Sequence, residues 1–239
     1  MILSRPQKGF TLIEIAVGMV IIALILGGII SLYSRQSLVN QVRTTRVQLE
    51  TIKQAIIGYA LTQRRLPCPD TDGDGVQDTQ PAFGVNCQNT GGANIYEGAV
   101  PYVTLGLPAN DAWGYPVRYV ISGRAAGDNF NDDPNGASAS FDFSSVGDIQ
   151  ITDYNGNILV NDAPLALISH GKNGGIAWNA PCTAANVPDN SERENCDNDR
   201  VLVSSSYRGS DANPVFDDIV DWIPLPVLKS KMLEGGVLP

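Results

Sequence analysis

One apolar segment, residues 10–30, constrains the chain more than any other feature, because it holds a single charged side chain, Glu14. About 20 consecutive apolar residues are enough for a helix to cross a lipid bilayer. A carboxylate inside such a helix is costly in hydrocarbon, so it is expected to have a partner and a function. The segment therefore predicts a membrane-spanning helix with one functional acid near its start.

The residues on either side of this segment predict its orientation. Arg5 and Lys8 precede it, and the positive-inside rule places this basic leader on the cytoplasmic side, with the rest of the chain across the membrane. An ordinary secretory signal would have an apolar core of about 7–15 residues and then a small-residue cleavage site, which residues 31–35 do not offer. A plain membrane anchor is the simpler alternative, but it gives no reason for Glu14 or for the Gly9–Phe10 junction.

Residues 8–14, KGFTLIE, resemble the class III signal of type IV pilins and type II secretion pseudopilins. The resemblance implies that a prepilin peptidase cleaves the chain between Gly9 and Phe10 and that Phe10 is N-methylated. It also implies that Glu14 pairs with the N-terminal amine of a neighbouring subunit. The implied partners are other pilin or pseudopilin subunits, the peptidase and the inner-membrane assembly platform.

Beyond the apolar segment, the pattern predicts that the helix continues, because apolar residues recur at intervals of three and four from Val42 to Tyr59. Pro67 and Pro69 then end it. We therefore expect a cleaved cytoplasmic leader at residues 1–9, a transmembrane helix half at 10–30 and an amphipathic half at 31–65. Residues 66–239 would form a periplasmic or extracellular β head.

Strand patterns dominate the second half of the head. Alternating residues predict strands at Tyr115–Ser122, Ile149–Thr152, Asn157–Val160, Leu165–Ser169 and Val201–Ser205, with a hairpin at Asn155-Gly156. The expected fold class is α+β, a long N-terminal helix packed on an antiparallel sheet as in pilins. The tail from Pro224 is expected to be peripheral, although its leucines could dock on the head.

The charge distribution argues against a nucleic-acid partner. From Leu66 onward, eight Lys and Arg stand against 23 Asp and Glu, a net charge of −15. Nucleic-acid binding needs basic patches that displace counterions from the phosphates, whereas the head carries a large excess of acidic residues. An acidic surface instead suits a soluble domain outside the cytoplasm.

Four cysteines fall into two local pairs, Cys68 with Cys87 and Cys182 with Cys196. An even count in an exported domain indicates disulfides, although four cysteines allow three pairings. We expect the local pairing, because each pair closes a short loop worth about 3 kcal/mol in the chain-entropy model. The rival interpretation, a four-cysteine zinc site, lacks the usual C-x2-C spacing.

The stretch from Asp70 to Asp78 is similar to the opening of a calcium loop. If Asp70 is position 1 of such a loop, Gly75 falls at position 6, where a calcium loop has its glycine. Alternate residues would then supply oxygen ligands. The candidate ligands are Asp70, Asp72, Asp74, the backbone carbonyl of Val76, and Asp78. Pro81 stands where an EF-hand has its bidentate Glu, so a solvated acidic turn is the alternative.

Two later segments resemble G-type pseudopilins. Residues 111–119 resemble their D-x-W-G-x-P-x-R-Y segment, with Trp113 as a core or edge anchor and Gly114 as a tight turn. Residues 217–222 resemble their D-D-I-x-x-W close. In that family nearby acids contribute to a calcium site beside the last strand, and the resemblance extends this role to Asp217 and Asp218. Ca²⁺ is therefore the one candidate cofactor.

His170 is the only histidine, and Ser169 precedes it. Neighbouring residues on a strand point to opposite faces, so the two are poorly placed to form a nucleophile–base pair. No G-x-S-x-G elbow supports a hydrolase. We therefore expect no catalytic residues, no enzyme activity, and a satisfied turn histidine at position 170.

These patterns predict a structural subunit, most simply a minor one, of a type IV pilus or a type II secretion pseudopilus. It would be a single-pass protein of the bacterial inner membrane, with a cytoplasmic N-terminus and a periplasmic head, before it joins the filament. The alternative function is a calcium-dependent adhesion or binding module displayed at a filament tip. The Asp70–Asp78 loop and the Cys182–Cys196 loop are the features that would distinguish the two.

Overall fold

The computed structural model describes residues 9, 11–79, 87, 94–123, 130, 142–208 and 215–238, and at residues 26–35 it describes the backbone alone. The chain divides into two compact units, residues 1–41 and residues 42–239. The predicted leader, residues 1–8, and Phe10 lie outside the described residues. So does Pro81.

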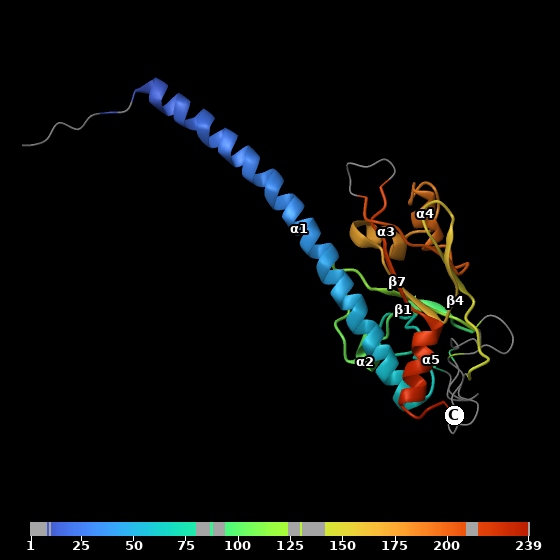
Figure 1. The fold of residues 1–239 in the computed structure, drawn as a ribbon. Helices are drawn as coiled ribbons and strands as arrows, with labels where there is room; N and C mark the ends of the chain where they lie inside the picture. Colours follow the sequence, from blue (N-terminus) through green and yellow to red (C-terminus); the bar gives the residue numbers. More distant parts are fainter. Residues whose placement is uncertain are drawn as a thin grey trace, which may run out of the picture. The chain divides into compact units, whose positions relative to one another are not determined.

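Helix α1 (Leu12–Gln63) begins in the first unit and ends in the second (Figure 1). In the first unit its described apolar side chains, such as Leu12 and Met19, are mostly exposed. Over the described part of the chain, none of the helices combines the length and the apolar character needed to cross a membrane. The predicted span at residues 10–30 stays a prediction.

In the second unit α1 packs against the core through the predicted apolar stripe. Leu49, Ile52 and Ile56 are buried, and Ile57 and Ala60 join them. On the adjoining face, Lys53 binds Asp221 at 2.8 Å and so ties the helix to the last strand. The apolar stripe predicted from Val42 to Tyr59 therefore faces the core.

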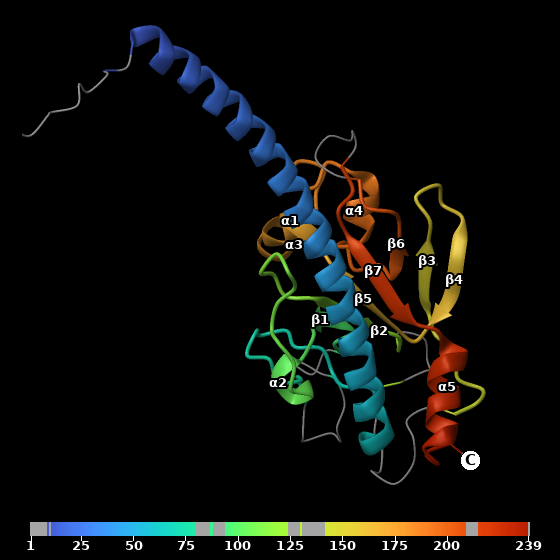
Figure 2. The same ribbon diagram turned by 60° about the vertical axis from the view of Figure 1, so that its left-hand side comes forward.

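The main sheet has four antiparallel strands in the order β1-β2-β5-β7. They are β1 (Glu97–Ala99), β2 (Arg118–Ile121), β5 (Leu165–Ser169) and β7 (Ile219–Ile223). Because side chains alternate between faces, Leu165 and Leu167 pack in the same core as α1. Ala166 and Ile168 pack on the opposite face, against a second sheet. Figure 2 shows the second-unit part of α1 passing across the main sheet.

The second sheet has the order β4-β3-β6. Its strands are β3 (Ile149–Thr152), β4 (Ile158–Ala163) and β6 (Val201–Val203). Strands β3 and β4 form the predicted hairpin, with Gly156 at a φ of 82° in its turn. Strand β6 pairs with β3 in parallel, so the expectation of purely antiparallel pairing is wrong at this one ladder.

The predicted strand Tyr115–Ser122 is shorter than expected and begins at Arg118. Asp111 accounts for the difference, since its Oδ1 accepts hydrogen bonds from the backbone N–H groups of Trp113 and Tyr115 at 2.9 and 3.0 Å. These bonds hold the residues before the strand in a turn, where Gly114 adopts a φ of 89°. Trp113 is partly buried against the core, as an anchor would be.

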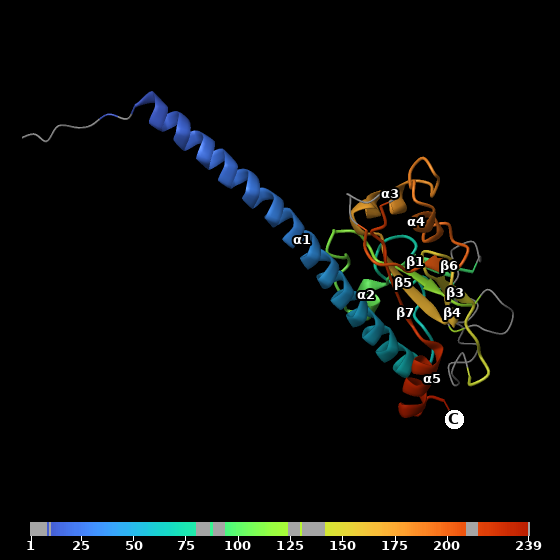
Figure 3. The same cartoon turned by 45° about the horizontal axis from the view of Figure 1, so that its top comes forward.

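The short helices are α2 (Tyr102–Leu105), the 3-10 turn η1 (Gly171–Asn173), α3 (Gly174–Asn179) and α4 (Asn190–Glu194). Figure 3 shows α3 and α4 at one end of the second unit and α5 (Leu225–Glu234) at the other. The tail expected to be peripheral is thus a helix. Its Leu225, Leu228 and Met232 are buried in the same core as α1, and Leu61 of α1 lies against Gly235.

Two disulfides join Cys68 to Cys87 and Cys182 to Cys196, which are the two local pairs predicted. The first follows the end of α1 and has both cysteines in the main core. The second lies at the end of the unit that carries α4, with Cys196 two residues beyond that helix. Each disulfide therefore closes a loop next to a helix.

Candidate functional site

Three buried carboxylates meet at the end of the second unit that carries α4. Glu192, Asp217 and Asp218 are each less than a twentieth exposed. One oxygen from each lies within 4.8 Å of the other two. This acidic centre, defined as Glu192, Asp217 and Asp218, is a candidate metal site.

Different elements deliver the three acids. Asp217 and Asp218 come immediately before β7, so the main sheet fixes their position. Glu192 sits on α4, whose first turn is capped by the side chain of Asp189, which accepts from the backbone N–H groups of residues 191 and 192. The disulfide-closed loop thus brings Glu192 to two acids that lie about 25 residues further along the chain.

Hydrogen bonds orient these carboxylates. Glu192 accepts from the backbone N–H of Asp217 at 2.8 Å and from Nδ2 of Asn173 at 2.9 Å. Asp218 accepts from Nδ2 of Asn195 at 2.8 Å. Asp217 accepts from the backbone N–H of Lys172 at 3.0 Å through Oδ2. The centre is therefore held by amide donors, which orient the acids without neutralising them.

One oxygen in the centre lacks a partner. Oδ1 of Asp217 is buried and accepts no hydrogen bond in the described part of the chain. Oδ1 of Asn173, whose amide adjoins Glu192, is in the same condition. Leaving a buried acceptor unsatisfied costs about 1–3 kcal/mol, and more when the acceptor is charged. Both oxygens are therefore suited to coordinate a cation.

His170 lies between this centre and the buried Arg118. Arg118 donates from Nε to Nε2 of His170 at 2.8 Å, so the ring proton lies on Nδ1, which faces Asp218 at 3.3 Å. Arg118 forms its own ion pair with Glu97. Among the described ion pairs, the contact of His170 with Asp218 is the one that involves the three acids.

The electrostatics follow from burial and from the closeness of the acids to one another. Burial, reinforced by the charge of Asp218, raises the pKa of Glu192 from 4.5 to about 8. The same two causes raise the pKa of Asp217. These two carboxyl groups therefore ionise less readily in the folded head than they would in water.

The donor set fits Ca²⁺. Every available ligand atom is an oxygen, from carboxylates or from the Asn173 amide, and hard cations such as Ca²⁺ take six to eight oxygens at about 2.3–2.6 Å. Asp218 also lines a pocket of about 330 Å³ with Arg46, Ser204, Tyr207, Asp221 and Trp222. The centre is thus buried but adjoins a space that water and small ions can enter.

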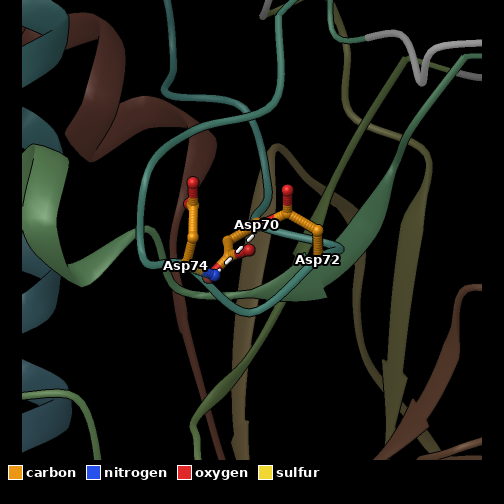
Figure 4. A group of neighbouring side chains, drawn as sticks. All are labelled: Asp70, Asp72 and Asp74. Carbon is orange, nitrogen blue, oxygen red and sulfur yellow. Dashed lines mark hydrogen bonds between the residues drawn. The ribbon is translucent and has the colours of Figure 1, made fainter.

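The predicted loop at Asp70–Asp78 brings together some of its candidate ligands. Oxygens of Asp70, Asp72 and Asp74 lie within 4.8 Å of one another. Figure 4 shows the three side chains around the turn, with the backbone N–H of Asp74 donating to Asp72 at 3.1 Å. Asp78 is not part of this group, because its carboxylate accepts from the backbone and the hydroxyl of Thr71.

Asp70 is already occupied within its own loop. Its two oxygens accept from the backbone N–H groups of Gly73 and Gly75 at 2.7 and 2.8 Å. Gly75 has a φ of 81°, and a Cβ there would collide with the ring of Tyr102. Hydrogen bonds within the loop hold its shape. The case for a solvated acidic turn is therefore stronger here than at the buried acidic centre.

Sequence reasoning placed Asp217 and Asp218 in a site but missed Glu192, Asn173 and the orienting Asn195. The predicted ligands also belong to two separate groups, since Asp217 and Asp218 meet Glu192 and not the Asp70–Asp78 loop. The one available signal was the polar loop bracketed by Cys182 and Cys196. The prediction for His170 is confirmed, because it is buried with a partner at each ring nitrogen, while the Ser169 hydroxyl donates to Asp111 instead.

The first unit carries a second candidate site at the start of α1. Glu14 accepts from both the backbone N–H and the hydroxyl of Thr11 at 2.9 Å, and its own N–H donates to the Thr11 hydroxyl at 3.3 Å. This is a capping box, in which the residue before the helix and the third residue of its first turn satisfy each other. Gly9 is exposed beside it.

Comparison with known proteins found a match for the N-terminal segment of this unit. Residues 4–30 match the family model of the prokaryotic N-terminal methylation motif. They are a class III signal of type IV pilins and pseudopilins. This pilin-type signal implies processing by prepilin peptidase, membrane anchoring and assembly with other pilin subunits. No curated protein and no solved structure matches the chain.

Proposed function

We propose that the chain is a minor structural subunit of a type IV pilus or a type II secretion pseudopilus. The peptidase cleaves between Gly9 and Phe10, and Phe10 is then N-methylated. Residues 10–30 hold the subunit in the bacterial inner membrane as a single span, with its head in the periplasm, until it joins the filament. The observation that carries this proposal is the methylation motif at residues 4–30.

Assembly depends on Glu14 in this proposal. In the subunit alone its carboxylate is bound by Thr11, which satisfies it without neutralising it. The methylated amine of a neighbouring Phe10 would supply the missing positive charge. A buried acid left without its partner costs several kcal/mol, so this pairing would favour correct register along the filament.

Cleavage is tested by Gly9→Leu. Gly9 is exposed and a Cβ there would meet no atom within 4 Å, so the substitution leaves the described structure undisturbed. We expect it to block cleavage, so that an immunoblot shows the chain at its uncleaved mass. Gly18→Leu, at an equally open position inside α1, should be cleaved normally. A mature-sized Gly9→Leu chain would remove the proposed processing site.

We further propose that the head binds Ca²⁺ at the acidic centre. Support comes from the Oδ1 of Asp217, which accepts no hydrogen bond in the described part of the chain, and from the gathering of three buried acids. When bound, Ca²⁺ would supply the positive charge that offsets these acids. Glu192 would then hold α4 against the start of β7, which makes the role structural. Calorimetric titration of the full chain should detect uptake that Glu192→Gln abolishes.

The Asp70–Asp78 loop is a second candidate for Ca²⁺, with Asp70, Asp72 and Asp74 as ligands. The roles of Val76 and Asp78 there stay predictions. The alternative function, a calcium-dependent adhesion module at a filament tip, draws on the same acidic centre. Binding of the full chain to a glycan array, with Ca²⁺ and with chelator, separates the alternatives, because a purely structural subunit shows no calcium-dependent signal.

A further inference from the structure

One disulfide closes the segment that serves the acidic centre. Cys182 and Cys196 are linked across 14 positions of sequence. Glu192 lies inside this ring, and Asn195, which orients Asp218, is the residue next to Cys196. A single covalent ring therefore carries one candidate ligand and the amide that positions another.

Little else holds this ring in place. Val187 is its one buried apolar side chain among the described residues, and residues 183–185 are exposed. Helix α4 has five residues, too few to persist in water without tertiary support. Outside the centre, the side-chain hydrogen bonds that join the ring to the described part of the head are those between Asn195 and Val203 and the bond from Tyr154 to Asp189.

Repulsion between acidic side chains also opposes the packing of the ring on the head. Glu192 is buried with two other acids, and one oxygen of each lies within 4.8 Å of the others. With the ring open, α4 could move away and relieve this repulsion at the cost of few apolar contacts. The disulfide restricts that movement, because it removes chain entropy from the open state.

We propose that the Cys182–Cys196 disulfide switches the Ca²⁺ site on, so that the disulfide form binds Ca²⁺ tightly and the dithiol form weakly. This inference rests on the calcium site proposed above. Oxidation breaks two S–H bonds and forms one S–S bond. The two electrons and two protons pass to a small-molecule disulfide, which becomes two thiols. Such oxidation is typical of compartments outside the cytosol, so the head acquires its cation only after export.

The same coupling must act in the opposite direction. If the disulfide raises the affinity for Ca²⁺ by some factor, Ca²⁺ favours the disulfide over the dithiol by the same factor. For a two-electron couple, a tenfold factor corresponds to a shift of about 30 mV in the reduction potential. Loading with Ca²⁺ therefore protects Cys182–Cys196 from reduction.

The first test compares Ca²⁺ titrations of the full chain, purified in detergent, by calorimetry. The variants are wild type, Glu192→Gln and the double variant Cys182→Ser/Cys196→Ser. We expect the Glu192-dependent event to weaken about tenfold or more in the double variant. The matched control, Cys68→Ser/Cys87→Ser, removes the other disulfide and should keep that event.

The second test needs no cysteine variant, and so does not depend on the folding of one. Wild-type chain is equilibrated in glutathione buffers of graded potential, with Ca²⁺ or with chelator, then alkylated and analysed by mass spectrometry at Cys182 and Cys196. We expect Ca²⁺ to make this pair harder to reduce by the factor found calorimetrically. Glu192→Gln should lose the shift.

The outcomes separate the two proposals. If wild type and Glu192→Gln take up Ca²⁺ identically, the calcium site fails and the switch fails with it. If Glu192-dependent uptake is present but the Cys182–Cys196 potential is the same with and without Ca²⁺, only the switch is overturned. A shift in wild type that disappears in Glu192→Gln supports both.

Discussion

Thr11 and Glu14 satisfy each other's hydrogen-bonding groups at the first turn of α1. The Glu14 carboxylate accepts from the N–H and the hydroxyl of Thr11 at 2.9 Å, and the Glu14 N–H donates to the same hydroxyl at 3.3 Å. The acid that we propose to pair with a neighbouring subunit therefore also caps the start of its own helix. Two roles of one side chain can be separated by mutation.

Glu14→Ala should leave the chain cleaved and membrane-bound but poorly incorporated into filaments, because it removes both the cap and the charge. Thr11→Ala removes the cap, at a cost of about 1 kcal/mol, and keeps the carboxylate. We expect Thr11→Ala to be incorporated nearly as well as wild type, measured by immunoblot of sheared filaments. Equal defects in the two variants would show that capping, and not charge pairing, is what assembly requires.

Ca²⁺ should decide which of wild type and Glu192→Gln is the more stable protein. Without Ca²⁺ the variant removes one of three clustered charges, so its melting temperature should exceed that of wild type at pH 8. With saturating Ca²⁺ wild type should be the more stable, since ligand binding stabilises the folded state by mass action. Differential scanning fluorimetry of both proteins checks the crossover.

The control for that comparison is Glu234→Gln, the same substitution at an exposed position of α5 that belongs to none of the acidic groups found among the described residues. It should leave the response to Ca²⁺ as in wild type. If the two variants behave alike, a diffuse loss of negative charge explains the result and the buried centre does not.

Stability should also depend on pH in the absence of Ca²⁺. Because the pKa of Glu192 rises from 4.5 to about 8 on folding, the folded state binds more protons than the unfolded chain within that range. The free energy of unfolding therefore falls as pH rises from about 4.5 to about 8. Urea titrations at pH 5 and pH 8 in chelator measure this contribution.

Two controls isolate the Glu192 contribution to that pH dependence. Glu192→Gln lacks the titrating group and should lose this part of the slope. Saturating Ca²⁺ should flatten the wild-type profile in the same way, because a bound cation favours the ionised carboxylate. An identical slope in wild type and variant would assign the pH dependence to other acids, such as Asp197, whose pKa burial raises to about 6.

Leu228→Ala should destabilise the head by about 2–5 kcal/mol, because it removes a fully buried side chain from the core that α5 shares with α1. Leu233→Ala is the matched control, since that leucine lies on the same helix and is 50% exposed. It should change the free energy of unfolding by about 0.5 kcal/mol or less. If Leu228→Ala lowers the free energy of unfolding as little as Leu233→Ala does, α5 contributes little to the core.

The parts of the fold that follow local rules could be predicted from sequence. The bounds of β3 and β5 match the expected strands, and Gly156 forms the expected turn. Helix α5 lies in the tail from Pro224, which was expected to be peripheral. Pro224 is the residue before the helix and Pro226 lies in its first turn, where no N–H is needed.

The candidate site was less predictable, for a physical reason. Asp217 and Asp218 lie next to a strand and fit a local motif, whereas Glu192 reaches them only after the chain has folded. Nothing in the spacing of Glu192 distinguishes it from its neighbour Glu194, which is not part of the centre. Which acid is buried depends on how the Cys182–Cys196 ring packs, and that is a tertiary property.

The two disulfides also limit how far the chain can be stretched. If a filament under tension pulled the second unit apart, the loops closed by Cys68–Cys87 and Cys182–Cys196 would not lengthen. They span sequence separations of 19 and 14, with Cα–Cα distances of 5.2 and 5.9 Å. At about 3.3–3.6 Å per extended residue, about 100 Å of contour length is withheld from the applied force until the disulfides are reduced.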